Sequence, residues 1–261
     1  QEIDDPEDFS KHIFNQCNGI KSLEVAFSMA ILDLWCQQNN YPLYEYLNAD
    51  PMQAPHTSYT ISIGDIGLIS EKVNEGAPYS ILKVKLGMGV DKDKEIMKAI
   101  RLETDKIIRV DANEGWDLET GIEMCQWLSE KGVEFVEQPF KSTNLKDTAE
   151  LRKKSPLPLI ADENSLQSGD IPGIEGIFDG INIKLMKCGS LFEALRMIKM
   201  ARDRDMKIML GCMIESSIGI TAAAHLSPLV DYADLDGNLL INNDPYQGAG
   251  VEGGKLILPE G

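Results

Sequence analysis

Short apolar runs alternate with longer helical patterns through most of the chain. The apolar runs cover residues 57–64, 81–87, 106–113, 134–140, 159–164, 180–185, 207–213 and 232–237. The segments with helical periodicity cover residues 65–76, 91–103, 117–132, 144–154, 169–178, 190–205 and 216–226. Strands that are separated by helices pair in parallel, and eight such strands are the number that closes into an α/β barrel.

The two ends of the chain fall outside this alternation. Residues 1–50 contain a helical pattern over 20–37, and Pro42 interrupts the pattern that follows. We therefore predict a helical element at 1–50, a barrel at 51–240 and a C-terminal segment at 241–261 that wraps back toward the helical element. A length of 261 residues suits one barrel domain.

The charge balance narrows the class of partner. The chain has 42 acidic and 25 basic residues, a formal net charge of −17, which argues against nucleic acid and anionic membranes. Its five cysteines are scattered without a Cys-x-x-Cys pair, and no apolar stretch is long enough to cross a membrane. We expect a cytoplasmic protein with a small-molecule partner, and a homo-oligomer is left open.

Three successive predicted strands end in a carboxylate. Asp111, Glu137 and Asp162 end the third, fourth and fifth strands. The C-terminal strand ends of an α/β barrel face the catalytic mouth, so these acids are expected to be neighbours. A hard divalent cation would remove their mutual repulsion, and oxygen ligands without His or Cys favour Mg²⁺, with Mn²⁺ as the alternative. The other interpretation is that each acid forms its own salt bridge.

Two lysines end strands on opposite sides of the predicted barrel. Lys85 ends the second strand and Lys184 the sixth, four positions apart in a ring of eight. Two amino groups that flank a substrate suggest that one removes a proton from carbon and the other delivers a proton to the opposite face. Lys83 shares the face of Lys85, and its charge is expected to lower the pKa of Lys85. The alternative is that both lysines pair with the acids around the mouth.

Lys187 is a second candidate for the role of Lys184. Lys184 continues the alternation of the sixth strand, whereas Lys187 falls in the segment that follows it. A lysine in a loop is ordinarily solvated, so we expect the side chain of Lys187 to lie in solvent. The proton-transfer role is therefore assigned to Lys184.

The order and spacing of these residues resemble the enolase superfamily, specifically its muconate-lactonizing-enzyme-like branch. The segments that carry the resemblance are Lys-Val-Lys at 83–85, Asp-Ala-Asn at 111–113, Val-Glu-Gln-Pro at 136–139, Ala-Asp-Glu at 161–163 and Ile-Lys-Leu-Met-Lys-Cys-Gly-Ser at 183–190. The resemblance implies a TIM-type (β/α)7β barrel with a residual helical piece of an N-terminal capping domain.

The resemblance also implies roles for individual residues. It implies one Mg²⁺ on the carboxylates Asp111, Glu137 and Asp162, and acid/base roles for Lys85 and Lys184. Its supporting residues would be Lys83, Asn113 and Glu163. The reaction step shared by the superfamily is removal of the proton α to a carboxylate, where a divalent metal and lysine charge stabilise the enolate.

A further motif narrows the choice of function within this branch of the superfamily. Ala-Asp-Leu-Asp-Gly at 233–237 resembles the Asp-x-Asp motif with which dipeptide epimerases hold the α-ammonium group of the substrate. A dipeptide bound by its carboxylate at the metal would place its ammonium group near Asp234 and Asp236, across the barrel. Met213 and Glu215, after the seventh strand, are expected to line the same pocket. The alternative is an ordinary Asp-rich turn.

The resemblance thus implies a Mg²⁺-dependent dipeptide epimerase that inverts the α-carbon of the C-terminal residue. L-Ala-D/L-Glu or a related dipeptide is the implied substrate, and cell-wall peptide metabolism the implied pathway. Residues 1–50 are expected to be the helical remainder of the capping domain, without the loops that select the substrate side chain. The alternatives are a cycloisomerase, an o-succinylbenzoate synthase and a catalytically silent metal-binding barrel fragment. The Asp-x-Asp motif favours the epimerase, because a substrate without an ammonium group has no use for it.

Overall fold

The computed structural model describes residues 3–40, 42–62 and 64–259. Residues 1–2, 41, 63 and 260–261 lie outside the described residues. They belong to the predicted helical element, the first predicted strand and the predicted C-terminal segment.

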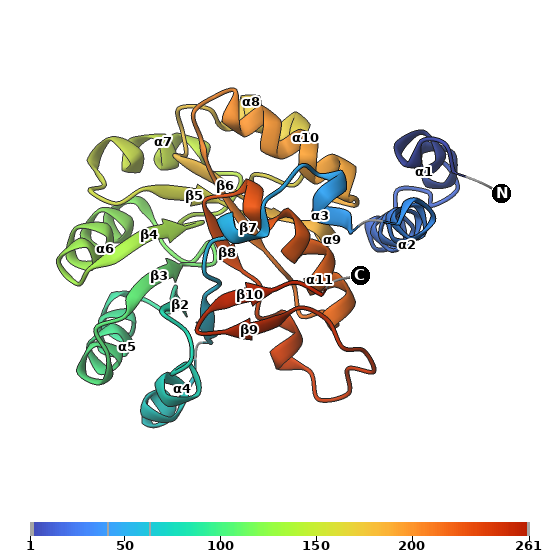
Figure 1. Cartoon of the computed structure of the whole chain (residues 1–261). Coiled ribbons are helices and arrows are strands. Elements are labelled where there is room, and N and C mark those ends of the chain that lie inside the picture. Colours follow the sequence, from blue (N-terminus) through green and yellow to red (C-terminus); the bar gives the residue numbers. More distant parts are fainter. Residues whose placement is uncertain (1–2, 41, 63, 260–261) are drawn as a thin grey trace.

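Eight parallel strands form one sheet in the order of the sequence (Figure 1). They are β1 (Tyr59–Ile61), β2 (Ile81–Lys85), β3 (Ile107–Asp111), β4 (Val133–Glu137), β5 (Leu159–Ala161), β6 (Gly180–Lys184), β7 (Lys207–Gly211) and β8 (Tyr232–Asp234). Thr57, just before β1, forms a parallel bridge with Ala233 of β8, and Ser58 N donates to Ala233 O at 3.1 Å. The last strand thus returns to the first, which confirms the predicted TIM-type α/β barrel.

Helices follow the strands and cover the outside of the barrel (Figure 1). They are α4 (Ile69–Glu75), α5 (Val90–Glu103), α6 (Leu118–Glu130), α7 (Leu145–Lys154), α8 (Ile171–Ile174), α10 (Leu191–Arg202) and α11 (Ser217–Leu226). Each predicted helical segment overlaps one of them, although α8 is short because Gly176, at a φ of +77°, reverses the chain just after it. No helix in the described part of the chain has the length and apolar character needed to cross a membrane.

Short 3₁₀ helices complete the connections. They are η1 (Pro51–Gln53), η2 (Ile66–Leu68), η3 (Ser168–Asp170), η4 (Ser227–Leu229) and η5 (Gly237–Leu240).

Three helices precede the barrel: α1 (Pro6–Phe14), α2 (Lys21–Asn39) and α3 (Leu43–Tyr46). In Figure 1, α1 and α2 lie at one side of the barrel, where α2 packs against α9 (Leu185–Cys188) and α1 packs against α2. Leu191 N, at the start of α10, donates to Ser28 Oγ of α2 at 3.2 Å. The sequence did not predict α1, although it carries a start signal. Asp5 accepts hydrogen bonds from Glu7 N and Asp8 N, and a proline follows it.

The C-terminal segment forms an antiparallel hairpin of β9 (Gly250–Glu252) and β10 (Lys255–Ile257). The hairpin turns at two glycines with φ of +58° and +82°, which is the backbone that a tight hairpin turn requires. Thr57 N donates to Gly254 O at 2.8 Å, and Ala249 N donates to Thr221 Oγ1 at 2.7 Å. The segment therefore packs against the chain just before β1 and against α11.

Alternation along the strands brings charged side chains into the barrel. In β2, Leu82 and Val84 are fully buried among the apolar side chains that pack under the helices, whereas Lys83 and Lys85 point to the other face. Lys85 pairs in register with Asp111 of β3, and Asp111 pairs with Glu137 of β4. Charged residues of neighbouring strands therefore meet at the C-terminal end of the barrel.

We predict that Gly180→Ala destabilises the barrel. A Cβ at Gly180 would lie 2.6 Å from Lys207 O and 2.7 Å from Ile160 Cδ1. Overpacking of this kind should lower the free energy of unfolding by about 1–3 kcal/mol. Gly173→Ala is the matched control, because in the described part of the chain no neighbouring atom would lie within 4 Å of a Cβ there. Urea denaturation followed by circular dichroism measures both variants, and equal stability of the two would contradict the prediction.

Candidate active site

The ammonium group of Lys83 lies in the barrel interior among three carboxylates. Its Nζ is 2.8 Å from Glu137 Oε2, 2.9 Å from Asp234 Oδ2 and 3.3 Å from Asp111 Oδ2, and the side chain is 3% exposed. Burial alone would lower the pKa of Lys83, but the charges of the three carboxylates outweigh burial and hold this pKa well above its ordinary value. Lys83 therefore joins β2, β3, β4 and β8 through its charge.

Lys85 lies nearer to solvent than Lys83. Its side chain is 37% exposed, and its Nζ is 3.8 Å from Asp111 Oδ2. Asp111 therefore lies within ion-pair range of both lysines of β2, whose side chains share one face of the strand. The more exposed of the two ammonium groups is the one that the sequence assigns to proton transfer.

Lys184 and Lys187 both bind Asp162. Lys184 Nζ lies 2.8 Å from Asp162 Oδ2, and Lys187 Nζ lies 2.8 Å from Asp162 Oδ1. Burial would raise the pKa of Asp162, but the two lysines outweigh it and lower this pKa. Lys187 also lies 3.4 Å from Glu163 Oε1. One carboxylate thus holds two ammonium groups at the end of β6.

The prediction of a solvated Lys187 is wrong. Its side chain is 20% exposed and ion-paired, because the chain enters α9 directly after Lys184 instead of forming an open loop. One helical turn brings residues three positions apart to the same side, so Lys184 and Lys187 both reach Asp162. The three-residue spacing between the two lysines is the signal in the sequence that could have revealed this arrangement, although it was not used in the prediction.

Glu137 is fully buried and carries a perturbed carboxyl group. Burial, followed by the charge of Asp111, raises its pKa to about 7. Asn182 Nδ2 of β6 donates to Glu137 Oε1 at 2.7 Å. Sequence reasoning missed Asn182, which lies two positions before Lys184 and therefore on the same face of β6.

The three predicted metal ligands supply only oxygen donors. Asp111 and Glu137 are direct partners across β3 and β4, and Asp162 follows β5. Asn113 holds Asp111 Oδ1 through its backbone N at 3.0 Å and its Nδ2 at 2.8 Å. Within the described residues, no three His, Cys, Asp or Glu side chains converge on one point as a metal site requires. Lysine ammonium groups contact all three carboxylates instead, while the donor chemistry is the kind that Mg²⁺ prefers.

Asp234 and Asp236 lie at the end of β8, beside β1 and across the barrel from β4. The two carboxylates differ in their hydrogen-bond and ion-pair partners. Asp234 Oδ1 accepts a hydrogen bond from Ser58 Oγ at 2.5 Å, while its Oδ2 pairs with Lys83. Asp236 Oδ2 accepts from Thr60 N at 2.6 Å. Burial and then the charge of Asp234 raise the pKa of Asp236 to about 6, whereas for Asp234 the charge of Lys83 outweighs burial and lowers the pKa. Asp234 thus has a resident cation, and Asp236 is stabilised by an amide.

The loop between β7 and α11 contains Met213 and Glu215. The side chain of Met213 is 46% exposed. Glu215 Oε1 accepts a hydrogen bond from Met213 N at 3.0 Å, whereas its buried Oε2 has no hydrogen-bond partner among the described residues. Burial raises the pKa of Glu215. Glu215 therefore holds the backbone of this loop through its hydrogen bond with Met213 N.

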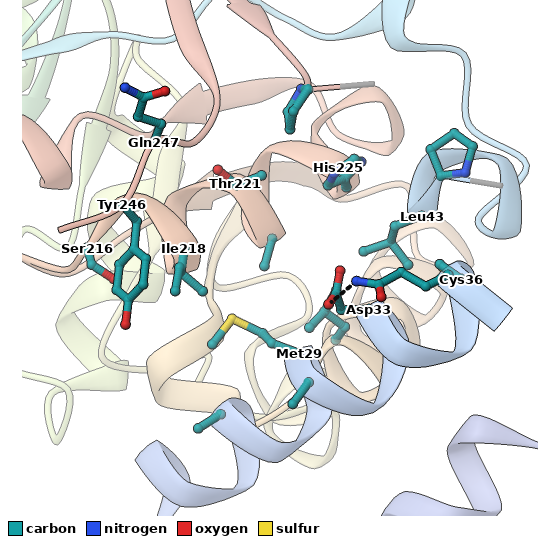
Figure 2. A pocket seen from close by; sticks show the side chains of 18 of the residues that line it. Met29, Asp33, Cys36, Leu43, Ser216, Ile218, Thr221, His225, Tyr246 and Gln247 are labelled. Atoms are coloured by element: carbon teal, nitrogen blue, oxygen red, sulfur yellow. Dashed lines mark hydrogen bonds between the residues drawn. The ribbon is translucent and has the colours of Figure 1, made fainter. Parts of the chain in front are cut away.

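A separate cavity of about 1030 Å³ lies between α2 and α11. Figure 2 shows Met29 and Asp33 of α2 on one side and Ile218, Thr221 and His225 of α11 on the other. None of the described residues that line it belongs to the lysine and carboxylate cluster of the barrel. Size alone therefore does not mark the place where the ionisable groups converge.

Comparison with known proteins gives the family. A sequence profile described as "Enolase C-terminal domain-like" matches residues 68–256. The chain belongs to this family.

Two relatives and one solved structure illustrate what this chain is similar to. An L-Ala-D/L-Glu epimerase of Bacteroides thetaiotaomicron is 44% identical over 237 residues, which are 90% of this chain and 61% of that protein. An L-Ala-D/L-amino acid epimerase of Flavobacterium johnsoniae is 41% identical, over 88% of this chain and 68% of that protein. The dipeptide epimerase from Cytophaga hutchinsonii, solved with Mg and the dipeptide D-Ala-L-Val, has a TM-score of 0.85 and 30% identity, over 93% of this chain and 69% of that one. This enolase-like chain therefore spans about two thirds of the length of these relatives.

We predict that Lys83→Met destabilises this enolase-like barrel, because it leaves buried carboxylates without their cation. As far as its own ionisation is concerned, the raised pKa of Lys83 means that its contribution to stability is fully present below pH 10.5 and is lost only as the pH rises above that value. The free energy of unfolding at neutral pH should fall by about 3–5 kcal/mol. The loss should shrink as the pH falls, since the carboxyl groups can then take up protons.

Chemical denaturation at a series of pH values measures this effect. Lys98→Met, at an exposed position of α5, is the matched control and should leave the stability nearly unchanged. An equal and small effect of both substitutions would show that the buried ion pairs contribute little.

Proposed function

We propose that the protein is a Mg²⁺-dependent dipeptide epimerase that inverts the α-carbon of the C-terminal residue. The observation that carries the proposal is the placement of Lys85 and Lys184 on β2 and β6, four strands apart in the ring, with carboxylates at the ends of the strands between them. The family membership and the epimerase names of the relatives support it.

Asp111, Glu137 and Asp162 would hold the Mg²⁺. When bound, this ion would supply positive charge next to the substrate carboxylate, where negative charge develops as the α-proton leaves. The protein prepares the ligands, since Asn113 orients Asp111 and Asn182 orients Glu137. Binding requires the carboxylates to exchange part of their contacts with ammonium groups for contacts with the ion. The Mg named in the related structure from Cytophaga hutchinsonii supports this assignment.

The two lysines would exchange roles between the two directions of the reaction. One lysine, in its neutral form, takes the α-proton, and the electron pair of the broken C–H bond remains on the substrate as an enolate. The opposite lysine, as an ammonium group, gives a proton to the other face of the same carbon, which inverts the configuration. Lys85 and Lys184 fit these roles because they end strands on opposite sides of the mouth.

Asp234 and Asp236 would hold the α-ammonium group of the dipeptide. A cation beside Asp236 would stabilise its ionised form, whose pKa is raised to about 6 in this structure. Asp234, which is ion-paired with Lys83, would add its negative charge on the same side of the ammonium group. Met213 and Glu215 would line the same side of the mouth. We interpret α1 to α3 as part of a capping region, and we take L-Ala-L-Glu and L-Ala-D-Glu as the first substrates to test.

The test is deuterium incorporation at the α-carbon of the C-terminal residue. Each epimer is incubated in D₂O with Mg²⁺, and the products are followed by NMR. We expect exchange and interconversion with the wild-type chain. Lys85→Ala and Lys184→Ala should each abolish interconversion. Each should still exchange the α-proton of the one epimer that the remaining lysine deprotonates.

Lys92→Ala, at an exposed position of α5, is the control and should match the wild type. Mg²⁺ binding without exchange from either epimer would favour a catalytically silent barrel and would overturn the proposed function.

A further inference from the structure

Asp93 is a fully buried carboxylate outside the cluster described above. It lies in the first turn of α5 and is 0% exposed. Its Oδ1 accepts hydrogen bonds from Gly87 N at 3.1 Å and Met88 N at 3.0 Å. Its Oδ2 accepts from Gly87 N at 3.0 Å and from Trp116 Nε1 at 2.8 Å. Hydrogen bonds to an ionised acceptor are about twice as strong as those between neutral groups, so these contacts hold both segments firmly.

The donors to Asp93 come from the two loops that follow β2 and β3. Gly87 and Met88 follow Lys85 by two and three positions, and Trp116 follows Asp111 by five. Leu86 N also donates to Asp111 O at 2.8 Å, which continues the pairing of the strands. Asp93 therefore joins the backbone that leaves Lys85 to the loop that leaves Asp111.

The two loops touch without any space between them. Gly87 has a φ of +104°, and a Cβ there would lie 2.4 Å from Ala112 O. A Cβ on Gly115 would lie 2.5 Å from Gly87 Cα. This close approach of backbone to backbone needs glycine at both positions. The carboxylate of Asp93 thus accepts hydrogen bonds from both loops at the point where their backbones are in contact, just after Lys85 in the chain.

Among the described residues, few side chains contact the ammonium group of Lys85 and could fix its orientation. It is 37% exposed, and its ion-pair contact with Asp111 is long, at 3.8 Å. Lys184, on the opposite side, is 10% exposed and lies 2.8 Å from Asp162. The position of Lys85 therefore depends on its backbone more than that of Lys184 does.

We propose that Asp93 is a positioning residue for Lys85, which it fixes relative to Asp111 for proton transfer. The proposal rests on the proposed epimerase function, and it assigns to Asp93 an effect on one of the two lysines only. Asp93 acts through the backbone of residues 86–88 and does not contact the reacting carbon.

The test compares the two half-reactions in Asp93→Asn. This substitution keeps the shape but turns an NH₂ group toward N–H donors, so that hydrogen bonds are lost. We expect the α-deuterium exchange of one epimer to slow by roughly 10- to 100-fold, the loss that a displaced catalytic group produces. That epimer should be the one whose exchange is abolished by Lys85→Ala. Exchange of the other epimer should remain near the wild-type rate.

If Asp93 had a merely structural role, Asp93→Asn would slow the α-deuterium exchange of both epimers equally, and that result would overturn the proposal. Asp91→Asn, at an exposed position in the same turn of α5, is the control and should change neither rate. Trp116→Phe removes a single donor, and a smaller loss for the same epimer is expected.

A second readout does not depend on activity. Amide hydrogen exchange, measured by mass spectrometry, should increase in Asp93→Asn for residues 86–88 and stay unchanged for residues 183–188, which contain Lys184. Unchanged exchange at 86–88 would overturn the proposal even in a chain that turns over no substrate. Absence of α-deuterium exchange in the wild type, together with increased amide exchange at 86–88, would instead show that the proposed function fails while the tie to the backbone exists.

Discussion

The burial of the Lys83 ammonium group is the interaction on which the interior of this barrel depends. A buried cation is stable only where anions surround it, and here carboxylates from three other strands do so. Removing Lys83 would leave the three carboxylates without this cation in a region of low dielectric constant. The cluster therefore constrains which side chains β2, β3, β4 and β8 can place in the barrel.

Compensation of buried carboxylates by lysines also extends to the C-terminal end of the barrel, where the strands open to the catalytic mouth. Lys184 and Lys187 neutralise Asp162, and Asn182 supports Glu137, whose pKa is raised by burial and by Asp111. The two lysines assigned to proton transfer differ in their surroundings, since the side chain of Lys85 is more exposed than that of Lys184. Under the proposed function, this difference means that the two half-reactions depend on different parts of the protein.

The sequence predicted the barrel well because strand and helix periods are local patterns. All eight strands overlap the predicted apolar runs, and the predicted helical segments overlap the helices that cover the barrel. The hairpin of β9 and β10 was missed because its residues are few and only partly apolar. The helix α9 was missed because four residues are too short to show a helical period.

The site could be predicted in its residue types but not in its contacts. Strand ends pointed to Asp111, Glu137 and Lys85, because a two-residue period decides which side chains share a face. The pairing of Lys83 with Asp234 joins positions 151 residues apart, so no local pattern reveals it. Asp93 was not singled out from the sequence, because its partners lie in loops whose positions only the folded barrel defines.

Under the proposed function, this cluster of carboxylates exchanges contacts with lysines for contacts with a divalent cation. Isothermal titration of Mg²⁺ into the protein tests this exchange most directly. We predict one ion per chain, with affinity lowered by roughly 100-fold or more in Asp162→Asn, since losing a group that only supports a ligand already costs about 10- to 100-fold. The affinity should be unchanged in Glu119→Gln, an exposed acid of α6. Saturable binding that is insensitive to Asp162→Asn, or no binding at all, would contradict the account.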